Sequence, residues 1–186
     1  MQLETLFSDK TLKYTGRELR PHWIFEEFGL RGDAAVSWVG PCHVGLEDLV
    51  DIEDADAGAY ISSDQMVHVI IEHFLFRDLL LGVHRQHILA AIAQQVIYEQ
   101  SGIMPHRAGN DLFVDERKLS VSIATSSPVS TLIHFGVNVI STGAPIPVSC
   151  LTDLEIQPRE FATALLEGYR DDISKMYAAV SKVRPR

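Results

Sequence analysis

Polar side chains fall within two segments that otherwise read as β-strands, RKLSVSIA (117–124) and STLIHFGVNV (130–139). In each, alternation should turn the apolar residues to one face and the small or polar residues to the other. The second face is expected to carry Lys118, Ser120, Ser122, His134, Gly136 and Asn138. A glycine within a strand leaves room for a ligand or a second backbone. We predict that these side chains line a polar cleft with Lys118 at its rim, the alternative being a solvated sheet face.

Two arginines and two cysteines are further candidates for chemistry. Arg17 and Arg20 lie in YTGRELRPHWIF (14–25), and guanidinium groups suit bidentate contacts with carboxylates or phosphates. The alternative is an arm that wraps the surface. Cys42 and Cys150 form neither a disulfide framework nor a metal motif, so each is either a small buried residue or a reactive thiol.

Six carboxylates crowd the segment 47–56. Such a run is typical of a solvated loop, and a divalent-metal site is the alternative, because hard cations bind several carboxylate oxygens. The spacing fits no metal-binding loop, so no metal site is predicted. His68 and Glu72 share one face of a strand expected at 66–74, either as catalytic groups or as residues of an emerging sheet edge.

Periodicity predicts the elements that must position these residues. Apolar residues recur every three or four positions over 77–102 and 158–180, which indicates two long helices. β-prone runs bounded by turn residues predict strands, among them 34–40, stopped by Gly40-Pro41, and 66–74. Helices alternating with hairpins indicate an α+β fold, with helices packed on a mostly antiparallel sheet. The length fits one domain, residues 1–186.

Each long helix is expected to bury one apolar stripe. The stripe of the first helix is predicted to be Leu79, Leu80, Val83, His87, Ile88, Ala91, Ile92, Gln95 and Val96. That of the second is predicted to be Phe161, Leu165, Leu166, Tyr169, Ile173 and Met176.

Composition narrows the range of functions. A hydrophobic fraction of 46% and a charged fraction of 22% are typical of a globular protein, and no apolar run is long enough to span a bilayer. The first residues lack the pattern of a signal peptide, so a cytoplasmic location is expected. A net charge of −9 argues against broad nucleic-acid binding, which needs Lys and Arg to displace counterions.

The ordered set of motifs resembles one family. GNDLFVDERKLSVSI (109–123) resembles the central motif of biotin and lipoate protein ligases, where an Asn-Asp pair opens a strand and a lysine follows a tight turn. HFGVNV (134–139) resembles their next strand. The resemblance covers about residues 66–155 and is closest to the branch called domain of unknown function 366. It implies the fold that biotin ligases share with class II aminoacyl-tRNA synthetases.

The resemblance also implies roles for individual residues. Lys118 matches the family's essential lysine, which would stabilise the charge that develops when a carboxylate attacks the α-phosphate of ATP. Asp111 matches the acid beside nucleotide and metal, and Asn110 a neighbouring polar contact. His134 and Asn138 would line the cleft. The implied ligands are a small carboxylate or its acyl conjugate, ATP and magnesium, with an acceptor protein as partner.

Three features depart from the ligase pattern. The segment 38–64 has no arginine and no glycine cluster, where ligases carry a Gly- and Arg-rich loop that holds the nucleotide. Ser120 and Val121 stand where ligases have a glycine, and no separate acceptor-docking domain is visible. Arg17 and Arg20 are the cations expected to replace the missing loop.

These departures keep other functions open. A related branch, the octanoyltransferases, moves an acyl group through a cysteine thioester without ATP, and Cys150 falls at the matching place after the His-Gly strand. A nearby Lys118 would lower the pKa of that thiol. The remaining alternatives are a binding module without turnover and a structural protein that dimerises through an exposed sheet edge.

Overall fold

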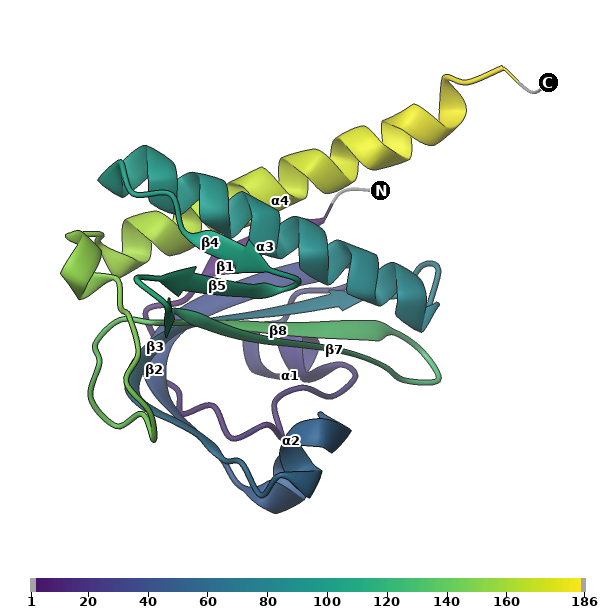
Figure 1. Ribbon diagram of the computed structural model, residues 1–186. Helices are drawn as coiled ribbons and strands as arrows, with labels where there is room; N and C mark the ends of the chain where they lie inside the picture. The colour runs from purple at the N-terminus through teal and green to yellow at the C-terminus, as the bar shows by residue number, and fades with distance from the viewer. Residues whose placement is uncertain (1–2, 185–186) are drawn as a thin grey trace.

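A five-stranded sheet forms the centre of the protein in a computed structural model, which describes residues 3–184 (Figure 1). Its strand order is β1-β2-β3-β8-β7; β1 and β2 are parallel, and the other pairs are antiparallel. The strands are β1 (Glu4–Phe7), β2 (Ala34–Val44), β3 (Ile61–His73), β8 (Thr131–Asn138) and β7 (Ser120–Ser126). A smaller antiparallel sheet comprises β4 (His106–Ala108), β5 (Asp111–Val114) and β6 (Arg117–Lys118). The predicted α+β fold class is confirmed.

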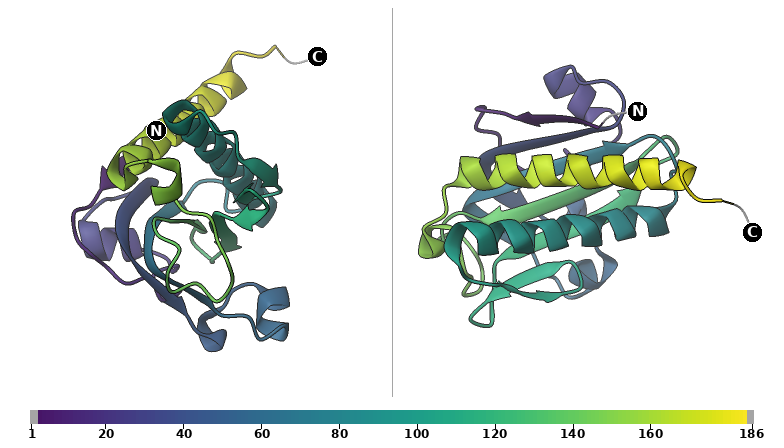
Figure 2. Two further views of the ribbon diagram at one scale, coloured as in Figure 1. Left: turned by 60° about the vertical axis from the view of Figure 1, so that its left-hand side comes forward. Right: turned by 90° about the horizontal axis from the view of Figure 1, so that it is seen from above.

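Two long helices cover one face of the large sheet. The helices α3 (Leu79–Ser101) and α4 (Pro158–Ser181) lie side by side across it (Figure 2), while α1 (Trp23–Phe28) and α2 (Ile52–Asp56) lie on its other side (Figure 1). Two 3₁₀ turns, η1 (Leu46–Asp48) and η2 (Thr152–Leu154), complete the described elements. Within residues 3–184, none of the helices has the length and apolar character needed to cross a membrane.

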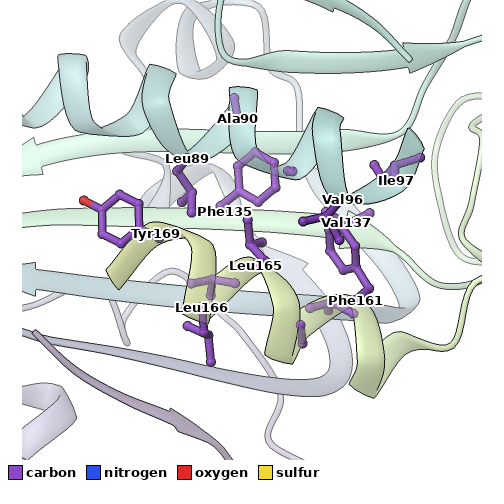
Figure 3. Packing of buried hydrophobic residues seen from close by; sticks show 14 of the residues in the cluster. Leu89, Ala90, Val96, Ile97, Phe135, Val137, Phe161, Leu165, Leu166 and Tyr169 are labelled. Atoms are coloured by element: carbon purple, nitrogen blue, oxygen red, sulfur yellow. The ribbon is translucent and has the colours of Figure 1, made fainter. Parts of the chain in front are cut away.

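The main core fills the space between the sheet and the two long helices (Figure 3). Alternation along β3 and β8 turns every second residue toward the helices, as predicted. The sheet contributes Val67, Val69, Ile71, Ile133, Phe135 and Val137. From α4 come Phe161, Leu165, Leu166, Tyr169 and Ile173, which confirms most of the predicted stripe. The prediction that Met176 belongs to the buried stripe is wrong, since its side chain is 39% exposed.

The predicted stripe of α3 is largely wrong. Val96 is buried, but Leu79 and Leu80 are exposed, while Arg85 and Gln86 are buried. Apolar residues occupy nearly every side of this helix, so their period does not select a face. The two polar side chains can face inward because Arg85 donates to the Tyr177 hydroxyl and Gln86 donates to Ser122 Oγ.

The strand β2 continues beyond its predicted end. A register shift between Gly40 and Cys42 absorbs Pro41, which cannot donate a ladder hydrogen bond. Gly40 is required there, because a Cβ would lie 2.0 Å from the Leu12 carbonyl oxygen. The longer hairpin of β2 and β3 reaches past the sheet and holds η1 and α2 at its tip (Figure 1).

Candidate functional site

A cavity of about 400 Å³ lies on the sheet face that α3 and α4 leave free. Its floor is formed by three strands of the large sheet. The residues that line it are Met66 of β3, His134 and Asn138 of β8, and Val121 and Ile123 of β7. The tip of the β2–β3 hairpin forms one wall, the small sheet a second, and the segment 144–148 a third. Each wall comes from a different part of the chain, so only the folded protein assembles the cavity.

Lys118 and Asp111 form an ion pair at the cavity wall. The distance from Lys118 Nζ to Asp111 Oδ2 is 2.8 Å, and the two side chains are 34% and 27% exposed. Local sequence explains the pairing. Asp115 and Glu116 both have positive φ, which builds a tight two-residue turn between β5 and β6 and sets Lys118 opposite Phe113. Alternation puts Asp111 on the same face as Phe113, so the ammonium and the carboxylate meet.

Two asparagines line the cavity and also hold its walls in place. Asn110 Nδ2 donates to the Ser122 carbonyl oxygen at 3.1 Å, which joins the small sheet to β7. Asn138 Nδ2 donates to the Ser149 carbonyl oxygen at 3.2 Å and approaches the Lys118 carbonyl oxygen at 3.4 Å. The backbone that carries Lys118 is therefore fixed on both sides.

His134 lies in the cavity floor within a stack of rings. Its Nε2 is 3.1 Å from His68 Nδ1, and the Tyr14 ring stacks on it with centroids 3.7 Å apart and planes 7° from parallel. Burial lowers the pKa of His134 well below its usual 6.5 and that of His68 to about 4. Both rings are neutral at pH 7, so neither supplies a positive charge to the cavity.

Ser120 and Ser122 do not form the predicted polar face: Ser120 is not among the lining residues, and the hydroxyl of Ser122, which does line the cavity, is hydrogen-bonded within the protein. Antiparallel partners share a face, and Val121 pairs with Gly136 while Ile123 pairs with His134. Ser120 Oγ instead accepts from the Leu112 N–H, and Ser122 Oγ donates to the His134 carbonyl oxygen. Serines that are hydrogen-bonded inside the protein give the same sequence alternation as serines in water.

Three other candidates lie away from the cavity floor. Arg17 pairs with Asp48 at 3.1 Å beside the cavity rim, and Arg20 pairs with Glu26 outside it. Cys150 is not among the lining residues; it is buried, and burial raises the pKa of its thiol. The structure thus brings Asn110, Asp111, Lys118, His134 and Asn138 together, and leaves Arg17 at the rim and Arg20 and Cys150 elsewhere.

Sequence reasoning missed an acidic wall and an aromatic one. Asp48, Asp51 and Asp54 line the cavity at the hairpin tip, where a solvated loop is predicted. Asp51 also caps α2, accepting from the Glu53 and Asp54 N–H groups. Tyr14 reaches the floor through a single parallel bridge to Cys42, which no local pattern indicates. In the part of the chain that the structure describes, no three His, Cys, Asp or Glu residues are placed to hold a metal.

Comparisons with known proteins decide the family. The model of DUF366, a domain of unknown function, matches residues 3–184. The chain belongs to the DUF366 family. A solved structure, a protein of unknown function from Pyrococcus horikoshi, is 38% identical to this chain, and the match covers 99% of both chains with a TM-score of 0.93.

The fold of this DUF366 protein is also that of the biotin and lipoate ligases. The biotin protein ligase from Aquifex aeolicus in complex with biotin and ATP superposes with a TM-score of 0.63 at 13% identity, over 93% of this chain and 71% of that one. A protein from T. acidophilum assigned as a lipoate protein ligase, with bound lipoic acid, gives 0.59 at 12% identity, over 93% and 86%. The family and the ligase-like fold predicted from the sequence motifs are confirmed.

Proposed function

We propose that this DUF366 protein binds a small carboxylic acid in its cavity and activates it by adenylation with magnesium-ATP. The observation that carries the proposal is the convergence of Lys118, Asp111, Asn110, His134 and Asn138 on one cavity of a ligase-like fold. Its volume of about 400 Å³ is within the range of small-molecule sites.

Lys118 is the group best placed to handle negative charge. Its ammonium is held by Asp111, but the pair is partly open to solvent, so an incoming anion can displace or share it. In the reaction the acid's carboxylate oxygen forms a bond to the α-phosphorus of ATP, and the bond to the departing pyrophosphate breaks. A mobile ammonium beside both anions offsets the charge that develops between them.

The lining residues favour a nucleotide that arrives with a divalent cation. Among the described residues of the lining, Lys118 is the one Lys or Arg, while four carboxylates are present, Asp48, Asp51, Asp54 and Asp111. A bare triphosphate would face more negative than positive charge. Magnesium is commonly held by one or two carboxylates together with substrate phosphates, and one or two carboxylates of the lining, such as Asp54 or Asp111, would supply them. Magnesium would supply the positive charge that the missing arginines do not.

The test is acid-dependent exchange of labelled pyrophosphate into ATP, with biotin, lipoate and octanoate as the acids. Lys118→Ala should lose the exchange at least about 100-fold, the usual scale for one electrostatic catalytic group. Lys175→Ala is the matched control, since Lys175 is 76% exposed on α4 and far from the lining. Unchanged exchange in Lys118→Ala would refute the assignment of the lysine.

A binding module without turnover is the second candidate. It is favoured by the absence of any arginine among the described lining residues. It predicts that an acid raises the melting temperature in a Lys118-dependent way, while no pyrophosphate exchange occurs with any acid. No shift with any acid, in the presence or absence of ATP, together with no exchange would contradict both candidates.

A further inference from the structure

A second cavity, of about 390 Å³, lies at the other end of the sheet face that carries the first. Among the described residues, the two cavities share no lining side chain. Along β3, alternation puts Met66 of the first lining and Glu72 of the second on this same face. Six residues of strand, or roughly 20 Å, separate them. The second cavity is therefore a separate place for a ligand, with a volume usual for small-molecule sites.

Glu72 is a buried carboxylate without a cationic partner in the described part of the chain. It is 2% exposed and yet lines the cavity, so it lies at the inner end. The His22 backbone N–H donates to its two carboxylate oxygens at 3.0 and 3.1 Å, and the Ser130 hydroxyl donates to Oε1 at 2.6 Å. Two neutral donors leave part of the acceptor capacity of a carboxylate unused. A cationic donor beside Glu72 would offset the cost of burying its charge.

His22 adopts an unusual backbone conformation in making this contact. Its φ is 64°, in the left-handed region that residues other than glycine rarely occupy. Its ring stacks on the Phe74 ring with centroids 5.3 Å apart, and both residues line the cavity. Backbone strain of this kind persists where the surrounding structure imposes it, and it clusters at ligand sites.

Arg31 brings the opposite charge to the same cavity. It is exposed, and its guanidinium group lies 5.3 Å from the centroid of the Phe25 ring, which also lines the cavity. Within residues 3–184, Arg31 forms an ion pair neither with Glu72 nor with another carboxylate. A buried carboxylate and an exposed guanidinium thus line one cavity without pairing. A ligand that carries both charges would satisfy both groups.

We propose that the second cavity binds a free α-amino acid with an apolar side chain. The ligand's ammonium group donates to Glu72, and its carboxylate accepts a bidentate contact from Arg31. Its side chain packs against the rings of Phe25 and Phe74. An acid without an ammonium group leaves Glu72 unpaired, and an amine without a carboxylate leaves Arg31 unpaired. This site goes beyond the proposed function and does not depend on it.

Chemical-shift titration of ¹⁵N-labelled protein with L-leucine tests the site. The backbone amide resonances of His22 and Gly32 should shift, since both residues line the cavity. L-Leucinamide lacks the carboxylate and 4-methylpentanoate lacks the ammonium group. Each should bind at least about tenfold more weakly than leucine when followed at these two amides. The two probes test Arg31 and Glu72 without substitution of a buried residue.

Arg31→Gln should abolish the preference for leucine over leucinamide. The affinity for leucinamide should stay the same, because this probe offers Arg31 no carboxylate. Arg31 is exposed, so the variant should keep the fold. Arg107→Gln is the matched control, since Arg107 is exposed on β4 outside both linings, and it should keep the preference.

Three results would overturn the site. They are no shift of the His22 and Gly32 amides with leucine, equal affinity for leucine and leucinamide, and a preference for leucine that survives in Arg31→Gln. Lys118→Ala should leave leucine binding unchanged, and its loss there would place the amino acid in the first cavity instead. Pyrophosphate exchange reports on the proposed function separately, so either proposal can fail while the other stands.

Discussion

His68 and His73 lie on the same strand, β3, and face opposite sides of the sheet. His73 is sealed under α4: its Nδ1 is 2.9 Å from Asp33 Oδ2, and its Nε2 is 2.9 Å from the Tyr169 hydroxyl. Because the Asp33 carboxylate accepts, His73 carries its proton on Nδ1 and accepts from the tyrosine. On the other side, His68 Nδ1 is 3.1 Å from His134 Nε2, and His134 Nδ1 has no hydrogen-bond partner among the described residues. Both His68 and His73 are fully buried. The two histidines differ in where their chains of hydrogen bonds end.

A closed network stabilises a fold, whereas an open one offers a ligand a defined atom. The helix face is therefore expected to respond to substitution through the free energy of unfolding. The cavity face should respond mainly through binding. The predictions below test this division, beginning with the largest expected change.

Phe161→Ala should cost about 3–5 kcal/mol of unfolding free energy, because its ring is fully buried between α4 and the sheet and leaves a cavity. Urea denaturation measures the change. Val180→Ala, at a position 76% exposed on the same helix, should change stability by less than about 0.5 kcal/mol. A small cost for Phe161→Ala would mean that the helix face is not the main source of stability.

Acidification should destabilise the protein between pH 6.5 and about 4. The His68 pKa is 6.5 in the unfolded chain and about 4 in the folded protein. Within this window the unfolded state binds more protons, so the unfolding free energy decreases as the pH is lowered. His68 alone accounts for roughly 3 kcal/mol. Lowered pKa values of His73 and His134 add to the same trend.

Urea denaturation from pH 7 to pH 4.5 measures this slope. His68→Leu should flatten it, even if the variant is less stable at pH 7. His84→Gln is the control, since His84 is exposed on α3. The pKa of Asp33 is lowered from 3.8 in the folded protein, so the stability that Asp33 contributes is lost only below pH 3.8, outside this window. A flat profile in the parent protein would show that the buried histidines are protonated without cost.

Matched tyrosine substitutions compare the two networks directly. Tyr169→Phe leaves His73 Nε2 without its donor and should cost about 1–3 kcal/mol. Tyr14→Phe removes a hydroxyl with no partner in the described residues and should change stability by no more than about 0.5 kcal/mol. Thermal and urea denaturation of both variants give the comparison. Equal losses would mean that the Tyr14 hydroxyl has a structural role.

Short-range sequence patterns were sufficient for part of this protein. Alternation predicted the correct faces of β3 and β8. The recurrence of apolar residues every three or four positions predicted most of the buried stripe of α4. The Asn110, Asp111 and Lys118 positions depend on one hairpin whose register is set by its own turn, so their grouping could be anticipated from neighbouring residues. The family motifs led to the correct fold for the same reason.

Other features depended on partners distant in the chain. Ser122 faces inward because Gln86 of α3 is there to donate to it, and Arg85 is buried because Tyr177 accepts from it. Neither partner can be identified from local periodicity, which records polarity and not whether a polar group is satisfied by water or by protein.

The sequence by itself determined the α+β class, the family and the residues of the β5–β6 hairpin, because propensity, alternation and turn chemistry act over a few residues. Only the tertiary structure decided that Tyr14 stacks on His134, that aspartates of the β2–β3 hairpin wall the cavity, and that Cys150 is buried away from it. These contacts join segments dozens of residues apart. Their geometry is set by strand register and helix packing, which no local pattern encodes.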